Sequence, residues 1–452
     1  MFFFKINKIE HHQYLDKLPK ISQSPCDVVC IYKAKSFREI ISQHILTAKK
    51  YIYITVLYFE CDYTGKNILD LLYKAKLARP SLDIKIFVDW HRARRTRIGA
   101  SNNITNANWY YQCSQTYPNF NIPIFGVPIN TQEALGVFHF KGFIFDNIII
   151  YSGASINNAY FQNGNNYRYD RYHLFHNTNL AGIMKDFIDK HLLTSPAVQR
   201  LDQKNFFYKK SIKNSIKKLR HNLKNYNYQF TNDASNEELS IIPLIGLGKN
   251  NNFNKTIIHL MNCTKNKIII STPYFNLPNI LKRVIKKLLL NGKTIEIITG
   301  DKIANDFYID PNKPFKIISV LPYIYEINLR KFIQTYQMYI DNNQLIVRIW
   351  KNGNNTYHVK GIWIDNNWQL ITGNNFNPRA WRLDLENAIL FHDPQELFQI
   401  TKNKELEYIN SSTVILKHYS ELDNINVYPK KVKKLIQNLH LIRIDKLMHY
   451  IM

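Results

Sequence analysis

The amino-acid sequence predicts an α/β fold of two duplicated domains, each a mixed β-sheet flanked by helices. The first observation behind this prediction is a pattern, His-x-Lys-x-x-x-x-Asp, that begins at His139 and begins again at His358, 219 positions later. The second is that stretches with helical periodicity alternate with short apolar stretches, in the same order in both halves. Such alternation favours helices packed on a sheet. We therefore expect two similar domains facing each other about a pseudo-two-fold axis, with an active site at their interface.

Each expected element follows from its hydrophobic period. An apolar residue every three or four positions predicts a helix, and a short run rich in Ile, Val, Tyr and Phe predicts a buried strand. In the first half these patterns predict helix 37–50, strand 51–59, helix 65–78 and strand 84–89. In the second half they predict helix 253–267, strand 268–275, helix 277–290 and strand 295–301. The repeated order indicates an internal duplication.

The length of 452 residues favours two domains of roughly 200 residues each over a single hydrophobic core. The expected parts are an N-terminal segment at 1–35, a first domain at 36–200, a connector at 201–244, a second domain at 245–400 and a C-terminal segment at 401–452.

The connector is expected to contain a basic amphipathic helix, because Ile212, Ile216, Leu219 and Leu223 follow helical spacing among basic residues. Such a helix binds an anionic membrane surface, with each basic side chain near it contributing on the order of 1 kcal/mol. The alternative is that the stripe packs on a domain while the lysines face water. The C-terminal segment repeats the pattern. The basic residues of the two segments are Lys209, Lys210, Lys213, Lys217, Lys218, Arg220, Lys224, Lys430, Lys431, Lys433, Lys434, Arg443 and Lys446.

The composition indicates a folded protein with an anionic partner. The chain is 45% apolar, and its net charge of +26 suits lipid headgroups, nucleic acid or a phosphorylated substrate. No apolar run reaches the ~18 residues of a membrane-spanning helix, and the opening Met-Phe-Phe-Phe-Lys is too short for a signal peptide, so we expect a cytoplasmic protein. Five scattered cysteines favour reduced thiols over disulfides or a metal site.

The repeated motif suits phosphoryl chemistry. In a strand, residues two apart share a face, so each motif is expected to present its histidine and lysine together. Where the two motifs meet, one of His139 and His358 would attack phosphorus to form a phosphohistidine, and the other would act as general acid and then base. Lys141 and Lys360 would neutralise phosphate oxygens, so no metal or other cofactor is needed. Further neutral donors are expected after each motif, from Ser155, Asn157, Asn375 and Asn377.

Carboxylates complete the candidate site. The motif aspartates, Asp146 and Asp365, belong to the candidate catalytic set, but they stand beside turn residues and are expected to fix the backbone of a hairpin. A carboxylate from a later strand is a better partner for an imidazole. Glu386 and Asp170 are the candidates for orienting the rings and raising their basicity.

The doubled motif, with its Gly-x-[Ser/Asn]-x-Asn tail, resembles the phospholipase D superfamily. Within it, several stretches are similar to the bacterial phosphatidylserine synthases, and the similarity runs nearly from end to end. These stretches are 87–93, 127–131, 135–141, 151–155, 272–278 and 371–383.

The resemblance implies a reaction in which CDP-diacylglycerol and L-serine give phosphatidylserine and CMP, which feeds phosphatidylethanolamine synthesis. It implies a phosphatidyl-histidine intermediate and favours His139 as nucleophile and His358 as acid and base, although the two motifs are similar enough to leave that assignment open. It also implies peripheral association with the inner face of the cell membrane. Residues for serine and cytosine stay open, with Arg92, Arg95, Tyr274 and Arg379 near the expected strand ends.

Three other functions compete with this interpretation. A cardiolipin synthase would use the same chemistry with another lipid alcohol, but such enzymes usually carry N-terminal hydrophobic segments. A hydrolytic phospholipase D would use water as acceptor. A nucleic-acid phosphodiesterase would suit the charge of +26, but the basic residues cluster on apolar-striped helices without stacking aromatics, so no specific nucleic acid is expected.

Overall fold

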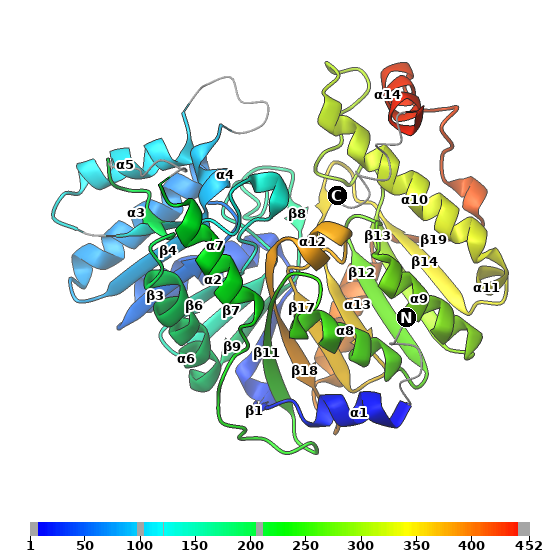
Figure 1. The fold of residues 1–452 in the computed structure, drawn as a ribbon, viewed down its shortest axis with the longest axis horizontal. Coiled ribbons are helices and arrows are strands. Elements are labelled where there is room, and N and C mark those ends of the chain that lie inside the picture. Colours follow the sequence, from blue (N-terminus) through cyan, green and yellow to red (C-terminus); the bar gives the residue numbers. More distant parts are fainter. Residues whose placement is uncertain (1–7, 97–103, 121, 205–210, 442–452) are drawn as a thin grey trace.

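The computed structural model describes residues 8–96, 104–120, 122–204 and 211–441. Two large mixed sheets lie side by side, each flanked by helices (Figure 1). This arrangement confirms the predicted α/β fold with two similar halves. Two large apolar cores are present, one centred on each half, as expected for a chain of this length. The first core extends into the second half, where it includes Ile371, Leu385 and Ile389.

The first sheet has the strand order β10-β5-β4-β3-β6-β7-β9-β2. Its centre is parallel, with β3 beside β4 and β4 beside β5, and the strands beyond β3 are antiparallel. The strands are β2 (Val28–Ile31), β3 (Tyr51–Thr55), β4 (Asp83–Asp89), β5 (Ile124–Val127), β6 (Gly142–Phe145), β7 (Ile148–Ser152), β9 (Tyr172–His176) and β10 (Gln199–Arg200). The helices are α2 (Ala34–Thr47), α3 (Tyr63–Ala78), α4 (Trp90–Arg94), α5 (Asn106–Thr116) and α6 (Thr178–Phe187), which continues as a π-helix at Ile188–Leu193. Short 3₁₀ helices lie at Pro25–Asp27 and Glu133–Leu135.

The second sheet has the order β1-β11-β18-β17-β16-β12-β13-β14-β19. The strands are β1 (Ile21–Ser22), β11 (Ser240–Leu247), β12 (Lys267–Thr272), β13 (Thr294–Gly300), β14 (Leu345–Trp350), β16 (Gly361–Ile364), β17 (Trp368–Thr372), β18 (Leu385–His392) and β19 (Thr413–Leu416). The helices are α8 (Asn252–Asn262), α9 (Asn279–Leu290), α10 (Leu321–Thr335), α11 (Gln337–Asp341), α12 (Pro378–Arg382) and α13 (Gln399–Asn410), with short turns at Ile317–Val320 and Tyr419–Glu421.

The two sheets repeat one topology. The run β5-β4-β3-β6-β7-β9 in the first sheet corresponds, in strand direction and neighbours, to β14-β13-β12-β16-β17-β18 in the second. The predicted strands 51–59 and 268–275 end earlier than expected, at Thr55 and Thr272. At the second of these ends, Pro273 follows, and proline has no N–H to donate to the ladder.

The halves exchange short backbone pairings where they meet. Strand β15 (Thr356–Tyr357) of the second half pairs in parallel with β8 (Arg168–Tyr169) of the first. In the corresponding place, Phe138 of the first half forms a parallel bridge with Leu385 of the second. Each motif is therefore reached by a strand of the opposite half, just before its histidine.

The N-terminal segment contributes to both halves. Helix α1 (Lys8–Asp16) contacts α8, β1 pairs with β11 of the second sheet, and β2 pairs with β9 of the first. The expected limits of the two domains remain a prediction, although the sheets receive strands from these flanking parts.

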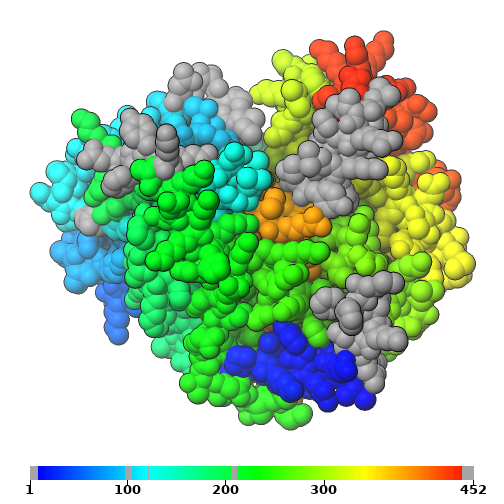
Figure 2. All heavy atoms as spheres, viewed as in Figure 1, coloured from blue at the N-terminus to red at the C-terminus, as the bar shows by residue number. Residues whose placement is uncertain are grey.

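The connector helix is α7 (Lys213–Lys224), and its apolar stripe is buried in the first core. Ile216, Leu219 and Leu223 are each no more than 3% exposed. The apolar stripe of α7 therefore packs on the first half, which was the alternative interpretation. These apolar residues do not contact lipid. Lys213, Lys217, Lys218 and Lys224 remain exposed. The segment that contains α7 is among the green atoms on the face shown in Figure 2.

Helix α14 (Lys430–Leu441) in the C-terminal segment behaves in the same way. Val432 and Ile436 are buried against Val320 and Tyr323, and Lys430, Lys431 and Lys434 are exposed. The predicted basic residues Lys209, Lys210, Arg443 and Lys446 lie outside the described residues. Among the described helices, none is both long and apolar enough to cross a membrane.

Candidate active site

A cavity of about 470 Å³ lies where the two halves meet. Its lining combines both motif histidines with basic, amide and aromatic side chains, which makes it polar and suited to a charged substrate. The residues predicted from the sequence that line it are His139, Lys141, Ser155, Asn157, His358, Asn375, Asn377, Arg92, Arg95, Tyr274 and Arg379.

The sequence predicted that the motif histidines and lysines lie within strands. In the structure they lie outside them. Strands β6 and β16 begin at Gly142 and Gly361, immediately after Lys141 and Lys360. The preceding residues are held by the opposite half instead. The backbone N–H of His139 donates to the carbonyl of Leu385 over 3.0 Å, and the N–H of His358 donates to the carbonyl of Tyr169 over 2.8 Å.

This exchange places a carboxylate beside each imidazole. Nδ1 of His139 lies 2.8 Å from Oε2 of Glu386, and Nδ1 of His358 lies 2.6 Å from Oδ2 of Asp170. Each carboxylate follows, by one position, the residue whose carbonyl binds the histidine backbone. The two candidates chosen from the sequence thus contact the histidines, and each belongs to the half opposite its partner.

The lysines are buried and are held differently. Nζ of Lys141 donates to Oγ of Ser155 over 2.8 Å, whereas Nζ of Lys360 donates to Oδ2 of Asp170 over 3.1 Å and also contacts Nδ1 of His358. Both side chains are no more than 1% exposed. One lysine therefore has a neutral partner, which leaves its charge available to a substrate anion.

Burial dominates the electrostatics of the site. It lowers the pKa of both histidines, with help from the neighbouring lysines, and the pKa of His358 falls to about 4. Burial and repulsion between the lysines lower the pKa of Lys141 to about 7, and burial lowers the pKa of Lys360 to about 8 despite the attraction of Asp170. The imidazoles are accordingly neutral near neutral pH, as a nucleophile or a base requires.

The two carboxylates differ. Burial, followed by repulsion from Asp384, raises the pKa of Glu386 well above its usual range. Burial also favours the neutral form of Asp170, but Lys360 and His358 outweigh it and lower the pKa. The two half-sites are therefore similar in shape but unequal in charge, which is suited to different tasks for the two histidines.

Tyr160 and Asn387 are among the side chains at the site that the sequence did not predict. The hydroxyl of Tyr160 lies 3.0 Å from Nδ1 and 3.1 Å from Nε2 of His358. Asn387 accepts from the backbone N–H of Lys141 over 2.9 Å and donates to its carbonyl over 2.8 Å. Neither belongs to a repeated motif, although Asn387 directly follows Glu386.

The glycines of the Gly-x-[Ser/Asn]-x-Asn segments allow the halves to approach. A Cβ on Gly153 would lie 2.7 Å from Oδ2 of Asp170 and 2.8 Å from Nζ of Lys360. A Cβ on Gly373 would lie 3.2 Å from Cγ of Lys141. Each segment therefore packs against the lysine of the opposite motif, and a side chain at Gly153 would displace it.

The predicted amide donors are partly committed to the fold. Oδ1 of Asn377 accepts from the N–H of Ala380 and caps α12, and Oδ1 of Asn157 accepts from the N–H of Tyr160. Oδ1 of Asn375 is buried without a hydrogen-bond partner among the described residues. Of the four predicted donors, Ser155 alone contacts a motif lysine.

The motif aspartates fix backbone turns. The carboxylate of Asp146 accepts from the backbone N–H groups of Lys49, Lys50 and Tyr51, over 2.8 to 3.0 Å. Asp365 accepts from the corresponding groups of residues 265–267, over 2.8 to 2.9 Å. Neither aspartate lines the cavity between the histidines.

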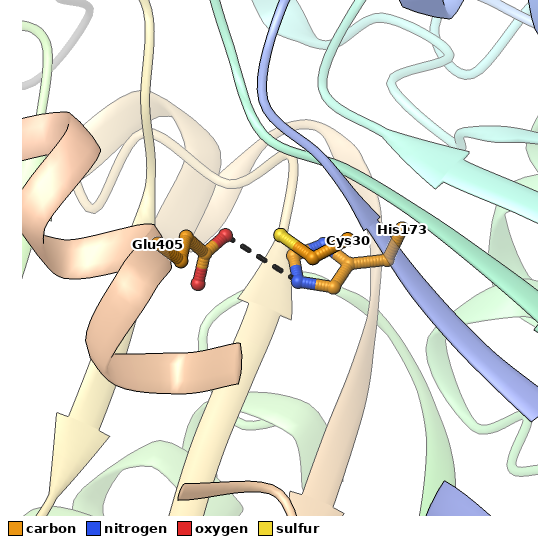
Figure 3. A group of neighbouring side chains, drawn as sticks. All are labelled: Cys30, His173 and Glu405. Carbon is orange, nitrogen blue, oxygen red and sulfur yellow. Dashed lines mark ion pairs between the residues drawn. The ribbon is translucent and has the colours of Figure 1, made fainter. Parts of the chain in front are cut away.

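A buried cluster joins the halves behind the second motif. Figure 3 shows Cys30 and His173 of the first half beside Glu405 of α13. These three ligand types can hold a metal ion, but the Glu405 carboxylate already accepts two N–H groups of Arg171, over 2.8 and 2.9 Å. Gln369 donates to one of the same oxygens over 3.1 Å. The guanidinium of Arg171 thus occupies the position beside Glu405 that a metal ion would need. Burial also raises the pKa of the Cys30 thiol and keeps the thiol neutral.

Comparisons with known proteins place this chain in a family. A family model described as "Cardiolipin synthase, PLD-like domain" matches residues 257–406. The CDP-diacylglycerol–serine O-phosphatidyltransferase of Escherichia coli (strain K12) is 53% identical over 99% of both chains. The enzyme of the same name from Haemophilus influenzae is 45% identical over 99% of this chain and 100% of its own.

A solved structure agrees with these relatives. The crystal structure of phosphatidylserine synthase from Haemophilus influenzae Rd KW20 has a TM-score of 0.95 and 44% identity, over 98% of this chain and 100% of that one. Because these matches cover 98 to 99% of this chain, they include both motifs and both sheets. The chain therefore belongs to the CDP-diacylglycerol–serine O-phosphatidyltransferase family of the phospholipase D superfamily, and it is a phosphatidyltransferase.

Proposed function

We propose that this protein transfers the phosphatidyl group of CDP-diacylglycerol to the hydroxyl of L-serine, giving phosphatidylserine and CMP, and so supplies phosphatidylethanolamine synthesis. The names of its relatives support this choice of substrates. The observation that carries the chemistry is the crossed pairing of His139 with Glu386 and of His358 with Asp170, with both histidines lining one cavity.

We assign His139 as the nucleophile. Its neutral imidazole attacks the phosphorus that bears the diacylglycerol, and the bond from that phosphorus to the CMP oxygen breaks. Three side chains distinguish His358: the Tyr160 hydroxyl lies near both ring nitrogens, at 3.0 Å from Nδ1 and 3.1 Å from Nε2, and Lys360 and Asp170 lie at Nδ1. A ring held at both nitrogens suits proton transfer better than attack on phosphorus.

His358 then serves both halves of the reaction. It protonates the departing CMP oxygen, and later takes the proton of the serine hydroxyl as that oxygen attacks phosphorus and the bond to His139 breaks. Because its pKa in the free enzyme is about 4, it must gain its proton when the donor binds. The negative charge of the bound diphosphate raises the pKa in this way.

The buried ammonium groups stabilise the transferred phosphoryl group. Lys141 has Ser155 as its neutral partner, so its charge is directed to a non-bridging oxygen, and Lys360 balances Asp170. Charge placed in advance in a buried site lowers the barrier without reorganisation of solvent.

The site is proposed to work at an anionic membrane surface, on the cytoplasmic side, with other polyanions as competing partners. The exposed lysines of α7 and α14 support an electrostatic attachment, in which the apolar stripes stay in the protein cores. Attachment of this kind weakens as salt is added.

Release of CMP from CDP-diacylglycerol in detergent micelles tests the proposal, with and without L-serine and in the presence of a chelator. Formation of phosphatidylserine that depends on serine and survives chelation supports it. Phosphatidic acid alone, or a product with another alcohol, would identify a hydrolase or a different acceptor. No release of CMP would contradict the proposed donor.

A further inference from the structure

A second charged pair lies in the cavity beside His358, and the steps proposed above give it no role. Nη2 of Arg168 lies 3.2 Å from Oδ2 of Asp306, and each side chain is 14% exposed. Both residues line the cavity. Arg168 comes from β8 of the first half, and Asp306 from the loop after β13 of the second.

Aromatic rings connect this pair to the histidine. The guanidinium of Arg168 lies over the ring of Tyr160, 4.8 Å from its centroid, and the hydroxyl of Tyr160 contacts His358. The hydroxyl of Tyr274 donates to Oδ1 of Asp306, and its ring centroid lies 6.2 Å from that of His358. Tyr160 therefore lies between Arg168 and His358, and Tyr274 lies between Asp306 and His358.

The pair retains capacity for a ligand. Of the five N–H groups of a guanidinium, those of Arg168 reach Thr356, Tyr58 and Asp306 among the described residues, over 3.2 to 3.3 Å. The remaining N–H groups can bind a carboxylate, and the Asp306 oxygens have lone pairs beyond the bonds from Tyr274 and Arg168. The rings of Tyr160 and Tyr274 also favour a cation beside Asp306.

We infer that Arg168 and Asp306 form the acceptor subsite, in which Arg168 binds the α-carboxylate of L-serine, Asp306 binds its α-ammonium, and the hydroxyl faces His358. This inference rests on the proposed function. A zwitterion requires two opposite charges close together, and an ion pair in the cavity already presents them at that spacing. An acceptor that lacks either charged group would leave one of the two buried side chains with a poorer partner.

The position also fits the order of events. The acceptor enters where CMP has left, on the side of phosphorus opposite the nucleophile, because His358 serves both the departing and the arriving oxygen. Arg168 can then meet the phosphate of CMP in the first step and the serine carboxylate in the second. The acceptor step must therefore be measured separately from the donor step.

Partition of the phosphatidyl-enzyme between serine and water provides that separation. Phosphatidylserine and phosphatidic acid arise from the same intermediate, so their ratio at a fixed serine concentration reports the acceptor step alone. We expect Arg168→Gln and Asp306→Asn each to lower this ratio by about tenfold to a hundredfold, as for loss of a hydrogen bond to a charged group. Arg168→Lys should recover part of the loss.

Two truncated acceptors distinguish binding from structural damage. With ethanolamine, which lacks the carboxylate, Asp306→Asn should still lower the ratio of transfer to hydrolysis, and Arg168→Gln should lower it much less. With 3-hydroxypropanoate, which lacks the ammonium, the order should reverse. An equal fall with all three acceptors would overturn the inference.

Controls keep the test decisive if a single variant leaves a buried charge and fails to fold. The double variant Arg168→Gln/Asp306→Asn removes both charges, and a serine ratio within twofold of the wild type would contradict the subsite. Glu296→Gln alters another buried carboxylate, bonded to Arg348 and Lys267 and remote from the cavity lining, and should keep the wild-type ratio. If the wild-type protein itself forms no phosphatidylserine, the proposed function and the inference both fail.

Discussion

Oε2 of Glu386 lies 2.8 Å from Nδ1 of His139, although the two residues come from different halves of the chain. Asp170 and His358 repeat the relationship in the opposite direction, at 2.6 Å. Neither half therefore contains a complete histidine–carboxylate pair, and the candidate site is formed only where the halves pack together.

Replacement of either carboxyl group by an amide should slow the reaction. We expect Glu386→Gln and Asp170→Asn to lower kcat by about a hundredfold or more, because the carboxylate fixes the tautomer and stabilises the imidazolium. Steady-state kinetics with CDP-diacylglycerol and serine would measure this. Wild-type kcat in both variants would show that the carboxylates do not assist the histidines.

Activity should fall as the pH rises past the pKa of the buried lysines. The pKa of Lys141 is lowered to about 7, so the cation is present below that pH and lost above it. The alkaline limb of kcat/KM should therefore lie near neutral pH, and that of kcat should lie higher, because a bound phosphate raises the pKa.

Lys141→Arg tests the assignment of that limb. A guanidinium keeps its charge at all these pH values. The limb should move up towards about 8, the pKa of Lys360, even if the maximal rate is lower. An alkaline limb that stays in place would assign it to another group.

The motif aspartates should affect stability rather than catalysis. Asp146→Ala and Asp365→Ala each remove an acceptor of three backbone N–H groups, which should cost about 1 to 3 kcal/mol of unfolding free energy. Denaturant unfolding would measure the loss. The kcat of the folded fraction should remain near the wild-type value, and a hundredfold loss there would restore a catalytic role.

The pair formed by Arg171 and Glu405 should be essential to the contact between the halves. Glu405→Gln leaves a buried guanidinium without its anion, and we expect a loss of about 3 to 5 kcal/mol. Glu407→Gln, on the same helix but exposed, is the matched control and should change stability by less than about 0.5 kcal/mol. Equal unfolding midpoints for the two variants would contradict this role.

The features predicted correctly from the sequence are those that depend on residues close together in the chain. The duplication, the strands β4 and β13 and the helices α3 and α9 follow from hydrophobic periods and are present within a few residues of the expected bounds. The motif residues could be identified for the same reason, since their spacing repeats.

Apart from the carboxylates chosen as partners of the histidines, contacts between the halves could not be predicted in this way. Tyr160 and Arg171 are buried polar residues whose partners, His358 and Glu405, lie 198 and 234 positions away. The stripe of α7 has the same spacing whether it covers a protein core or a lipid surface, so only its burial decides between them. Each of these residues is defined by packing between distant segments, which no local spacing encodes.

The most direct test is to find the phosphatidyl group on His139. CDP-diacylglycerol labelled with ³²P at the phosphorus next to the diacylglycerol would be mixed with the protein, quenched within milliseconds and digested. We predict acid-labile, alkali-stable label on the peptide that contains His139, and none in His139→Ala. In His358→Ala the label should increase if transfer from the phosphohistidine to serine is slower than formation of the phosphohistidine. A burst of CMP without labelled protein, or label on the peptide that contains His358, would contradict the proposed mechanism.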